Sequence, residues 1–270
     1  MELDAPTKPG GGTGTPRLTG APNFRDLGGY AARDGRRLRH RRLYRSDALT
    51  RVTAGDMRIL DGLPIVVLCD VRSARERAAC PNGWPSDQAI ECLHLDVSND
   101  LRAANAVLMR VLTENCTASD ANQVMLATYR SMPRAFVGRL AQIVDRLLAS
   151  PERAVIVHCT AGKDRTGFVC AILMLALGID RDTVFEEYML TAARCDVHSL
   201  AAASADAIAA AIGRQPKEEF NLALAGVSEE YLQLALATVD SEFGSIEGYL
   251  QTAGGLDPER RAQLQDLLLE

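Results

Sequence analysis

A cysteine and an arginine six residues apart stand in one glycine-bearing loop, and their types point to chemistry on an anionic group. The stretch HCTAGKDRTG runs from His158 to Gly167 and contains Cys159 and Arg165. A cysteine thiolate is a strong nucleophile, and the planar fork of an arginine holds two oxygens of one phosphoryl group. The pair therefore predicts attack of sulfur on phosphorus, with a covalent phosphocysteine intermediate.

The elements on either side of this loop decide whether the two side chains can meet. The apolar run 154–158 indicates a buried strand, and 168–177, which ends before Gly178, indicates a helix that is apolar nearly all round. A loop that closes a strand and opens a helix presents backbone N–H groups and the positive end of the helix dipole to one point. We expect Gly162 to let the backbone curl there, so that the loop binds a phosphate dianion and favours the thiolate of Cys159.

Further apolar patterns predict an α/β fold. Residues 63–71 and, more weakly, 90–97 indicate strands buried between helices. Between 133 and 150 the apolar residues have the spacing of one helical face. They are Phe136, Val137, Leu140, Ile143, Val144, Leu147 and Leu148. We expect three layers, with a central, mainly parallel sheet flanked by helices.

Composition argues against several classes of protein. The net charge of −5 gives no reason to expect nucleic acid or an anionic membrane as a partner, and the longest apolar run is too short to span a bilayer. Seven scattered cysteines without CxxC pairs indicate free thiols and no metal site. Residues 1–16, rich in Gly, Pro and Thr, indicate a disordered segment that is not a signal peptide. We expect a cytoplasmic protein with one domain at 17–270; export by a route that lacks a signal peptide stays open.

The loop HCTAGKDRTG resembles the signature loop of cysteine-dependent protein tyrosine phosphatases and, within them, of the bacterial PtpB-like family. Three further stretches are similar to that family: NFRDLGG at 23–29, DVRSARE at 70–76 and FGSIEGYL at 243–250. The resemblance covers residues from about 18 to 269. It implies the tyrosine phosphatase fold and phosphate-ester hydrolysis without a cofactor or metal. It also implies helices over the active site, placed at about 180–226 as a lid-like insertion, for which a plain pair of surface helices is the alternative.

Carried onto this sequence, the resemblance implies a role for each residue of the loop. Cys159 is expected as the nucleophile and Arg165 as the phosphate clamp. His158 would orient the loop and tune the thiolate, and the Thr166 hydroxyl would donate to the sulfur as it leaves the phosphoenzyme. The residues expected to bind the substrate phosphate are Cys159, Thr160, Ala161, Gly162, Lys163, Asp164 and Arg165.

The general acid is open between two aspartates. The chain has no Trp-Pro-Asp stretch of the kind that carries this residue in many tyrosine phosphatases, since GWPSD at 83–87 places a serine before the aspartate. Asp164 lies within the phosphate-binding loop, whereas Asp70 ends a predicted strand at the edge of the sheet where such sites gather. Asp70 could instead form a structural salt bridge with Arg72. We favour Asp164.

Lys163 bears on the choice of substrate. Lipid phosphatases that act on phosphoinositides carry a lysine at this place in similar loops, so the resemblance implies both phosphoprotein and phosphoinositide hydrolysis. We expect phosphotyrosine proteins as the main substrates, with phosphoserine or phosphothreonine proteins and phosphoinositides in addition. A primarily phosphoinositide phosphatase, a sulfurtransferase and a catalytically silent phosphate-binding module are the alternatives. Lys163 could also point to solvent or pair with a nearby carboxylate.

Overall fold

A mainly parallel sheet forms the centre of the computed structural model, which describes residues 15–84, 90–97, 117–212 and 214–270. Its strands are β1 (Arg25–Asp26), β2 (Leu43–Ser46), β3 (Ile65–Asp70), β4 (Glu91–His94) and β5 (Ala154–His158). They are ordered β1-β2-β5-β3-β4, and β1 alone of these five runs antiparallel to its neighbour. The predicted strands at 63–71, 90–97 and 154–158 are therefore confirmed.

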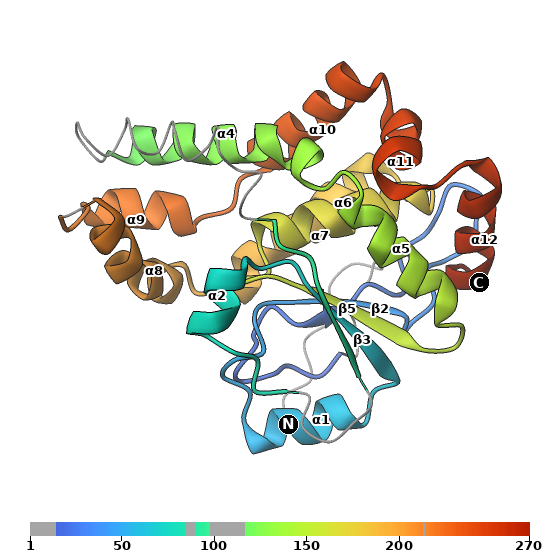
Figure 1. Ribbon diagram of the computed structural model, residues 1–270, viewed down its shortest axis with the longest axis horizontal. Helices are drawn as coiled ribbons and strands as arrows, with labels where there is room; N and C mark the ends of the chain where they lie inside the picture. Colours follow the sequence, from blue (N-terminus) through green and yellow to red (C-terminus); the bar gives the residue numbers. More distant parts are fainter. Residues whose placement is uncertain (1–14, 85–89, 98–116, 213) are drawn as a thin grey trace.

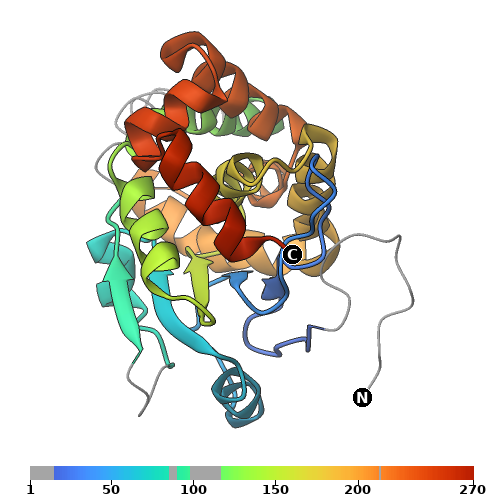
Figure 2. The same ribbon diagram turned by 90° about the vertical axis from the view of Figure 1, so that its right-hand side faces the viewer.

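Helices cover both faces of the sheet and make three layers (Figures 1 and 2). They are α1 (Ala54–Asp61), α2 (Ala74–Ala79), α4 (Ala118–Ala135), α5 (Arg139–Ala149), α6 (Asp164–Ala176), α7 (Arg181–Arg194), α8 (Val197–Ile212), α9 (Glu218–Ala225), α10 (Glu229–Phe243), α11 (Ile246–Gly254) and α12 (Pro258–Leu268). One face packs against α1, and the other against a larger core to which α5, α6 and α10 to α12 contribute. The predicted α/β class is confirmed.

The alternation of side chains explains why the central strands are apolar along their whole length. In β5, Val155 and Val157 face the larger core, whereas Ala154 and Ile156 face the core that contains Leu60 of α1. All four side chains are fully buried. A strand that is buried on both faces has no solvent-exposed position and so shows no polar alternation.

The helix predicted across 133–150 is wrong at its start. The chain forms α4 up to Ala135, breaks, and begins α5 at Arg139. Gly138 stands at the break with φ +73°, a left-handed conformation that an α-helix cannot contain. Val137, placed by the prediction on the buried face, is 39% exposed.

The segment at about 180–226 is divided in the structure. Val184 and Tyr188 of α7 are fully buried, so α7 belongs to the body of the molecule. By contrast, α9 packs against α4 and α8 packs against α9, away from the sheet (Figure 1). An opening of this part as a lid stays a prediction, and most of the segment predicted to be disordered (1–16) lies outside the described residues.

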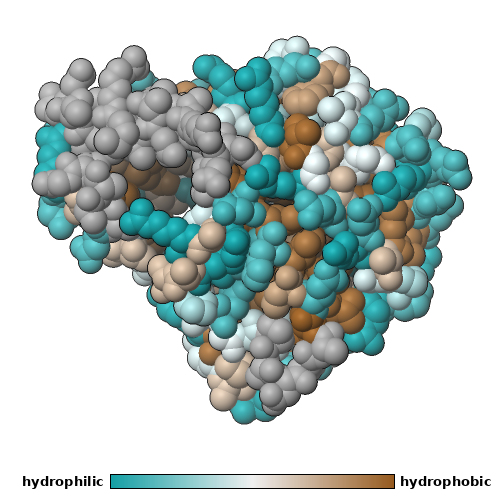
Figure 3. Space-filling model, in the orientation of Figure 1, coloured by the Kyte–Doolittle hydropathy of each residue, from teal (hydrophilic) through white to brown (hydrophobic). Residues whose placement is uncertain are grey.

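Among the helices in the described ranges, none is both long and apolar enough to cross a membrane. The face seen in Figure 3 mixes hydrophilic and hydrophobic residues.

Candidate active site

The loop of residues 158–165, here called the cysteine loop, joins the carboxyl end of β5 to the start of α6, as predicted. Cys159 directly follows the strand and is 3% exposed. Arg165 is the second residue of α6. Lys163, the N-cap residue, makes no side-chain hydrogen bond to the helix end, so N–H groups of the first turn remain for an anion.

Gly162 allows the cysteine loop to pass close to the end of β2. Its φ is +64°, and a Cβ atom at this position would lie 2.4 Å from the carbonyl oxygen of Ser46 and 2.5 Å from the backbone nitrogen of Asp47. A hydrogen bond joins the same two segments, since the N–H of Ala48 donates to the Thr160 carbonyl at 3.0 Å. The predicted curl at Gly162 is therefore confirmed, and no other residue type fits there without a shift of the backbone.

Two buried side chains hold the carbonyl groups of the cysteine loop. Asn23 Nδ2 donates to the carbonyls of Ala161 at 3.0 Å and Gly162 at 2.9 Å, and Arg45 Nη2 donates to that of Gly162 at 2.7 Å. In a trans peptide the C=O and the next N–H point in opposite directions. Fixing these two carbonyls on one side therefore turns the N–H groups of Gly162 and Lys163 to the other side.

Glu187 of α7 anchors these two supports. It accepts hydrogen bonds from Arg25 Nε and from Arg45 Nη1, each at 2.6 Å, and all three side chains are at most 2% exposed. Arg25 in turn donates to the side-chain oxygen of Asn23. Burial alone would raise the pKa of Glu187, but the two arginines outweigh burial and lower it. Sequence analysis missed Arg45 and Glu187, whereas Asn23 and Arg25 lie in the NFRDLGG stretch, which the resemblance placed near the mouth of the active site.

A second carboxylate, also missed, holds Arg165. Glu76 of α2 accepts hydrogen bonds from Nη1 of Arg165 at 2.8 Å and from Nη2 at 2.6 Å. It also accepts from the Thr160 hydroxyl and, through a capping box, from the N–H of Ser73. Burial opposes ionisation, but Arg165 outweighs burial and lowers the pKa of Glu76 far below its ordinary value. Arg165 also donates to the Val71 carbonyl and to the Thr160 hydroxyl, each at 3.4 Å, so among the described residues its Nε–H remains for a phosphoryl group.

Asp70 and His158 lie next to each other at the carboxyl ends of β3 and β5. Asp70 accepts hydrogen bonds from Arg72 Nε at 2.9 Å and Nη2 at 2.6 Å, and one of its oxygens lies 3.6 Å from His158 Nε2. Burial would raise the pKa of Asp70, but Arg72 outweighs it and lowers this pKa. Burial lowers the pKa of His158 to about 4, so its ring is neutral. Asp70 thus has the surroundings of the structural salt bridge that was the alternative to a proton donor.

Asp164, the other candidate acid, opens α6 and is partly exposed. Its Oδ1 accepts a hydrogen bond from the Tyr129 hydroxyl at 2.8 Å, and its Oδ2 lies 3.6 Å from Lys163 Nζ. The Asp164 side chain is 26% exposed. A substrate bound to the cysteine loop can therefore reach this carboxyl group.

Lys163 of the cysteine loop and Thr166 of α6 have surroundings that the sequence did not predict. Lys163 is buried, and its Nζ donates to the carbonyls of Leu224 at 2.7 Å and Gly226 at 2.8 Å, at the end of α9. The ammonium is therefore not exposed to solvent. Its partners are these two carbonyls in addition to the Asp164 carboxylate. The Thr166 hydroxyl is buried and has no hydrogen-bond partner among the described residues. Its predicted donation to sulfur stays a prediction.

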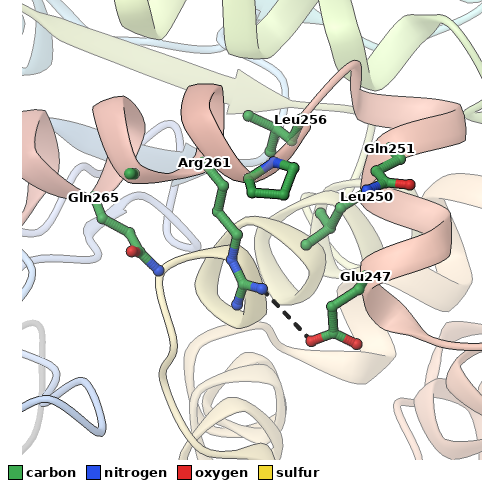
Figure 4. A pocket seen from close by; sticks show the side chains of 8 residues that line it. Glu247, Leu250, Gln251, Leu256, Arg261 and Gln265 are labelled. Carbon is green, nitrogen blue, oxygen red and sulfur yellow. Dashed lines mark hydrogen bonds and ion pairs between the residues drawn. The ribbon is translucent and has the colours of Figure 1, made fainter.

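A separate pocket of about 280 Å³ lies between α11 and α12 (Figure 4). Arg261 and Gln265 line it and donate to the carbonyl of Ala176, at the end of α6 opposite to the cysteine loop. It therefore forms no part of the candidate active site. Among the described residues, no cluster of His, Cys, Asp and Glu has the arrangement of a metal site.

Comparison with known proteins gives consistent matches over almost the whole chain. The model of the tyrosine phosphatase family matches residues 16–270. The triple specificity protein phosphatase PtpB of Mycobacterium tuberculosis is 32% identical over 261 residues, which cover 88% of this chain and 93% of that protein. A putative tyrosine-protein phosphatase of Cupriavidus necator is 30% identical over 235 residues, covering 87% and 82%. A crystal structure of TpbA from P. aeruginosa is 20% identical and covers 71% of this chain and 91% of its own, with a TM-score of 0.32, too low to bear on the fold.

Proposed function

The chain belongs to the tyrosine phosphatase family and hydrolyses phosphoesters, and we propose that its reaction passes through a phosphocysteine on Cys159, with phosphotyrosine proteins as main substrates. The predicted resemblance to PtpB-like phosphatases is confirmed by these relatives. One observation carries the proposal: Cys159 and Arg165 occupy a single strand-loop-helix unit, in which Glu76 fixes the arginine and Gly162 fixes the backbone.

In the first step the Cys159 thiolate attacks phosphorus. The S–P bond forms as the P–O bond to the leaving group breaks, and the electron pair of that bond goes to the leaving oxygen. Asp164 gives this oxygen a proton and is left ionised. Arg165 and the N–H groups at the start of α6 hold the equatorial oxygens, where charge gathers in the transition state.

In the second step water attacks the phosphocysteine. The ionised Asp164 takes a proton from this water as its oxygen bonds to phosphorus. The S–P bond breaks, and its electron pair returns to the sulfur of Cys159. The products are inorganic phosphate and the enzyme in its starting state, so the cycle needs no cofactor.

Replacement of the nucleophile tests the covalent step. Cys159→Ser should abolish turnover of p-nitrophenyl phosphate and keep tungstate binding measured by calorimetry, because the anion site consists mainly of backbone groups and Arg165. Cys92→Ser, a change at an exposed cysteine, should keep turnover within about twofold of wild type. Turnover by Cys159→Ser above a tenth of wild type would remove the nucleophile assignment, and sulfur transfer from thiosulfate by wild type would favour a sulfurtransferase.

Replacement of the acid tests the role of Asp164. Asp164→Asn should slow a phosphotyrosine peptide about 10²–10⁴-fold, and a substrate with an activated aryl leaving group much less, because only a poor leaving group needs the proton. Asp70→Asn should destabilise the fold and slow both substrates alike, since Asp70 pairs with Arg72. The opposite pattern in the two variants would transfer the role of acid to Asp70.

Lys163 supports phosphoinositides as a second substrate class. Its buried ammonium donates to two neutral carbonyls and lies 3.6 Å from the Asp164 carboxylate, and a second phosphate on the substrate could replace the two carbonyls as partner. Lys163→Ala should then lower kcat/KM for a soluble phosphoinositide about 10–100-fold more than for a phosphotyrosine peptide. Equal losses on both substrates would restrict Lys163 to a structural contact with α9.

A further inference from the structure

Two buried tyrosines connect Asp164 to helices that are distant in sequence. The Tyr129 hydroxyl, from α4, donates to Asp164 Oδ1 at 2.8 Å and lies 2.7 Å from the Tyr188 hydroxyl of α7. Both tyrosines are fully buried. Their rings meet edge to face with centroids 6.4 Å apart, and Tyr231 packs on the Tyr129 ring at 5.4 Å. Neither phenol has a part in the steps described above.

The number of protons sets the direction of this chain of hydrogen bonds. Each phenol has one O–H, and the O–H of Tyr129 is used toward Asp164. Tyr188 must therefore donate its own O–H to the Tyr129 oxygen. Burial raises the pKa of both tyrosines above the ordinary value, and the Asp164 carboxylate raises it further, so both phenols stay protonated.

The direction of these hydrogen bonds determines which oxygen of the Asp164 carboxyl group carries the transferable proton. While the Tyr129 hydroxyl donates to Oδ1, the proton of a neutral Asp164 has its place on Oδ2. Tyr188 is itself fixed, because its ring lies so close to α6 that a Cβ at Gly167 would be 2.9 Å from it. The two ends of this series of hydrogen bonds, Asp164 and Tyr188, thus lie on the packed helices α6 and α7.

We propose that Tyr129 and Tyr188 are positioning residues that hold the Asp164 carboxyl group with its proton on Oδ2, directed to the leaving-group oxygen. This inference rests on the proposed role of Asp164 as general acid. By this inference α4 and α7, which supply Tyr129 and Tyr188, support the proton transfer as well as the packing of the core.

The dependence of kcat/KM on the leaving group separates positioning from stability, because kcat/KM reports the steps up to the phosphoenzyme. Tyr129→Phe should slow a phosphotyrosine peptide about tenfold more than 2,4-dinitrophenyl phosphate, a part of what an acid supplies. Tyr188→Phe should show the same selectivity to a smaller degree. Inhibition by tungstate should be unchanged in both, since the anion site is intact.

Tyr249→Phe is the matched control, because its hydroxyl is equally buried and donates to the Pro133 carbonyl of α4 at 2.9 Å, away from Asp164. It should slow both substrates alike. If Asp164→Asn is selective for the leaving group and both Tyr129→Phe and Tyr188→Phe behave like Tyr249→Phe, the inference is overturned. If Asp164→Asn is itself not selective, the role of Asp164 fails and the inference fails with it. In the Asp164→Asn background, Tyr129→Phe should add no further selective loss.

Discussion

Replacing Glu76 by glutamine tests whether this carboxylate holds the phosphate clamp in its working position. The amide has the size and shape of the carboxylate but no charge, and one of its two terminal atoms is a donor. One of the two contacts with Arg165 would then become a neutral hydrogen bond, and the other would place an N–H against an N–H. The capping hydrogen bond from Ser73 can persist, because the glutamine oxygen can still accept it.

The size of the effect follows from the two contacts at 2.8 and 2.6 Å. A hydrogen bond to a charged group contributes about 1.5–3 kcal/mol, and solvent reduces this value here because Glu76 is 33% exposed and Arg165 15%. With one contact weakened and the other lost, we expect about 1.4–2.7 kcal/mol less transition-state stabilisation. This corresponds to a 10–100-fold lower kcat/KM.

The assay is kcat/KM for p-nitrophenyl phosphate, together with the Ki of tungstate and the melting temperature. Glu242→Gln is the matched control, since Glu242 pairs with Arg134 at 2.7 Å away from the cysteine loop. It should leave kcat/KM unchanged. A Glu76→Gln enzyme within about twofold of wild type, or one faster than wild type because the clamp had been freed, would refute the positioning argument.

Two further predictions concern the backbone and the charge next to the cysteine loop. Gly162→Ala should cost about 1–3 kcal/mol more stability than Gly35→Ala, because both glycines have positive φ but only Gly162 lacks space for a Cβ; equal costs in urea unfolding would contradict this. Burial raises the pKa of Asp47 to about 7, so folded Asp47 binds a proton more tightly than unfolded Asp47 does. The stability that this bound proton contributes is lost as pH rises from about 4 to 7. Asp47→Asn should therefore gain stability relative to wild type over this range, by about 1–3 kcal/mol for a partly exposed carboxyl, and a difference independent of pH would contradict the argument.

The elements that could be predicted are those whose surroundings leave a local pattern. The strands β3 and β5 are buried on both faces and so appear as continuous apolar runs, and the unit from β5 to α6 is contiguous in sequence. The break between α4 and α5 could not be seen in this way. Apolar spacing continues through it, and only the conformation of Gly138 shows that the helix stops.

In the candidate site, too, the residues that share one short loop could be predicted from the sequence, and those that come from other helices could not. Cys159 and Arg165 share one short loop, and their types alone indicate the chemistry. The carboxylates that hold the loop and the arginine come from other helices, with Glu76 89 residues before Arg165. Ser73 and Glu76 form a capping box in the structure, but no sequence pattern showed that the same carboxylate would also meet Arg165.

Two adjacent residues of α7 limit how the proposed lid could move. Glu187 holds Arg45 and, through it, the Gly162 carbonyl, whereas Tyr188 supports Asp164 through Tyr129. A motion that carried α7 away would leave buried charges without partners, at a cost of about 3–5 kcal/mol for the ion pairs alone. By contrast, the end of α9 contacts the site through the two carbonyls that accept from Lys163, which a phosphate could replace. We therefore expect any opening to be confined to α8 and α9, with α7 staying in place as the support of the cysteine loop.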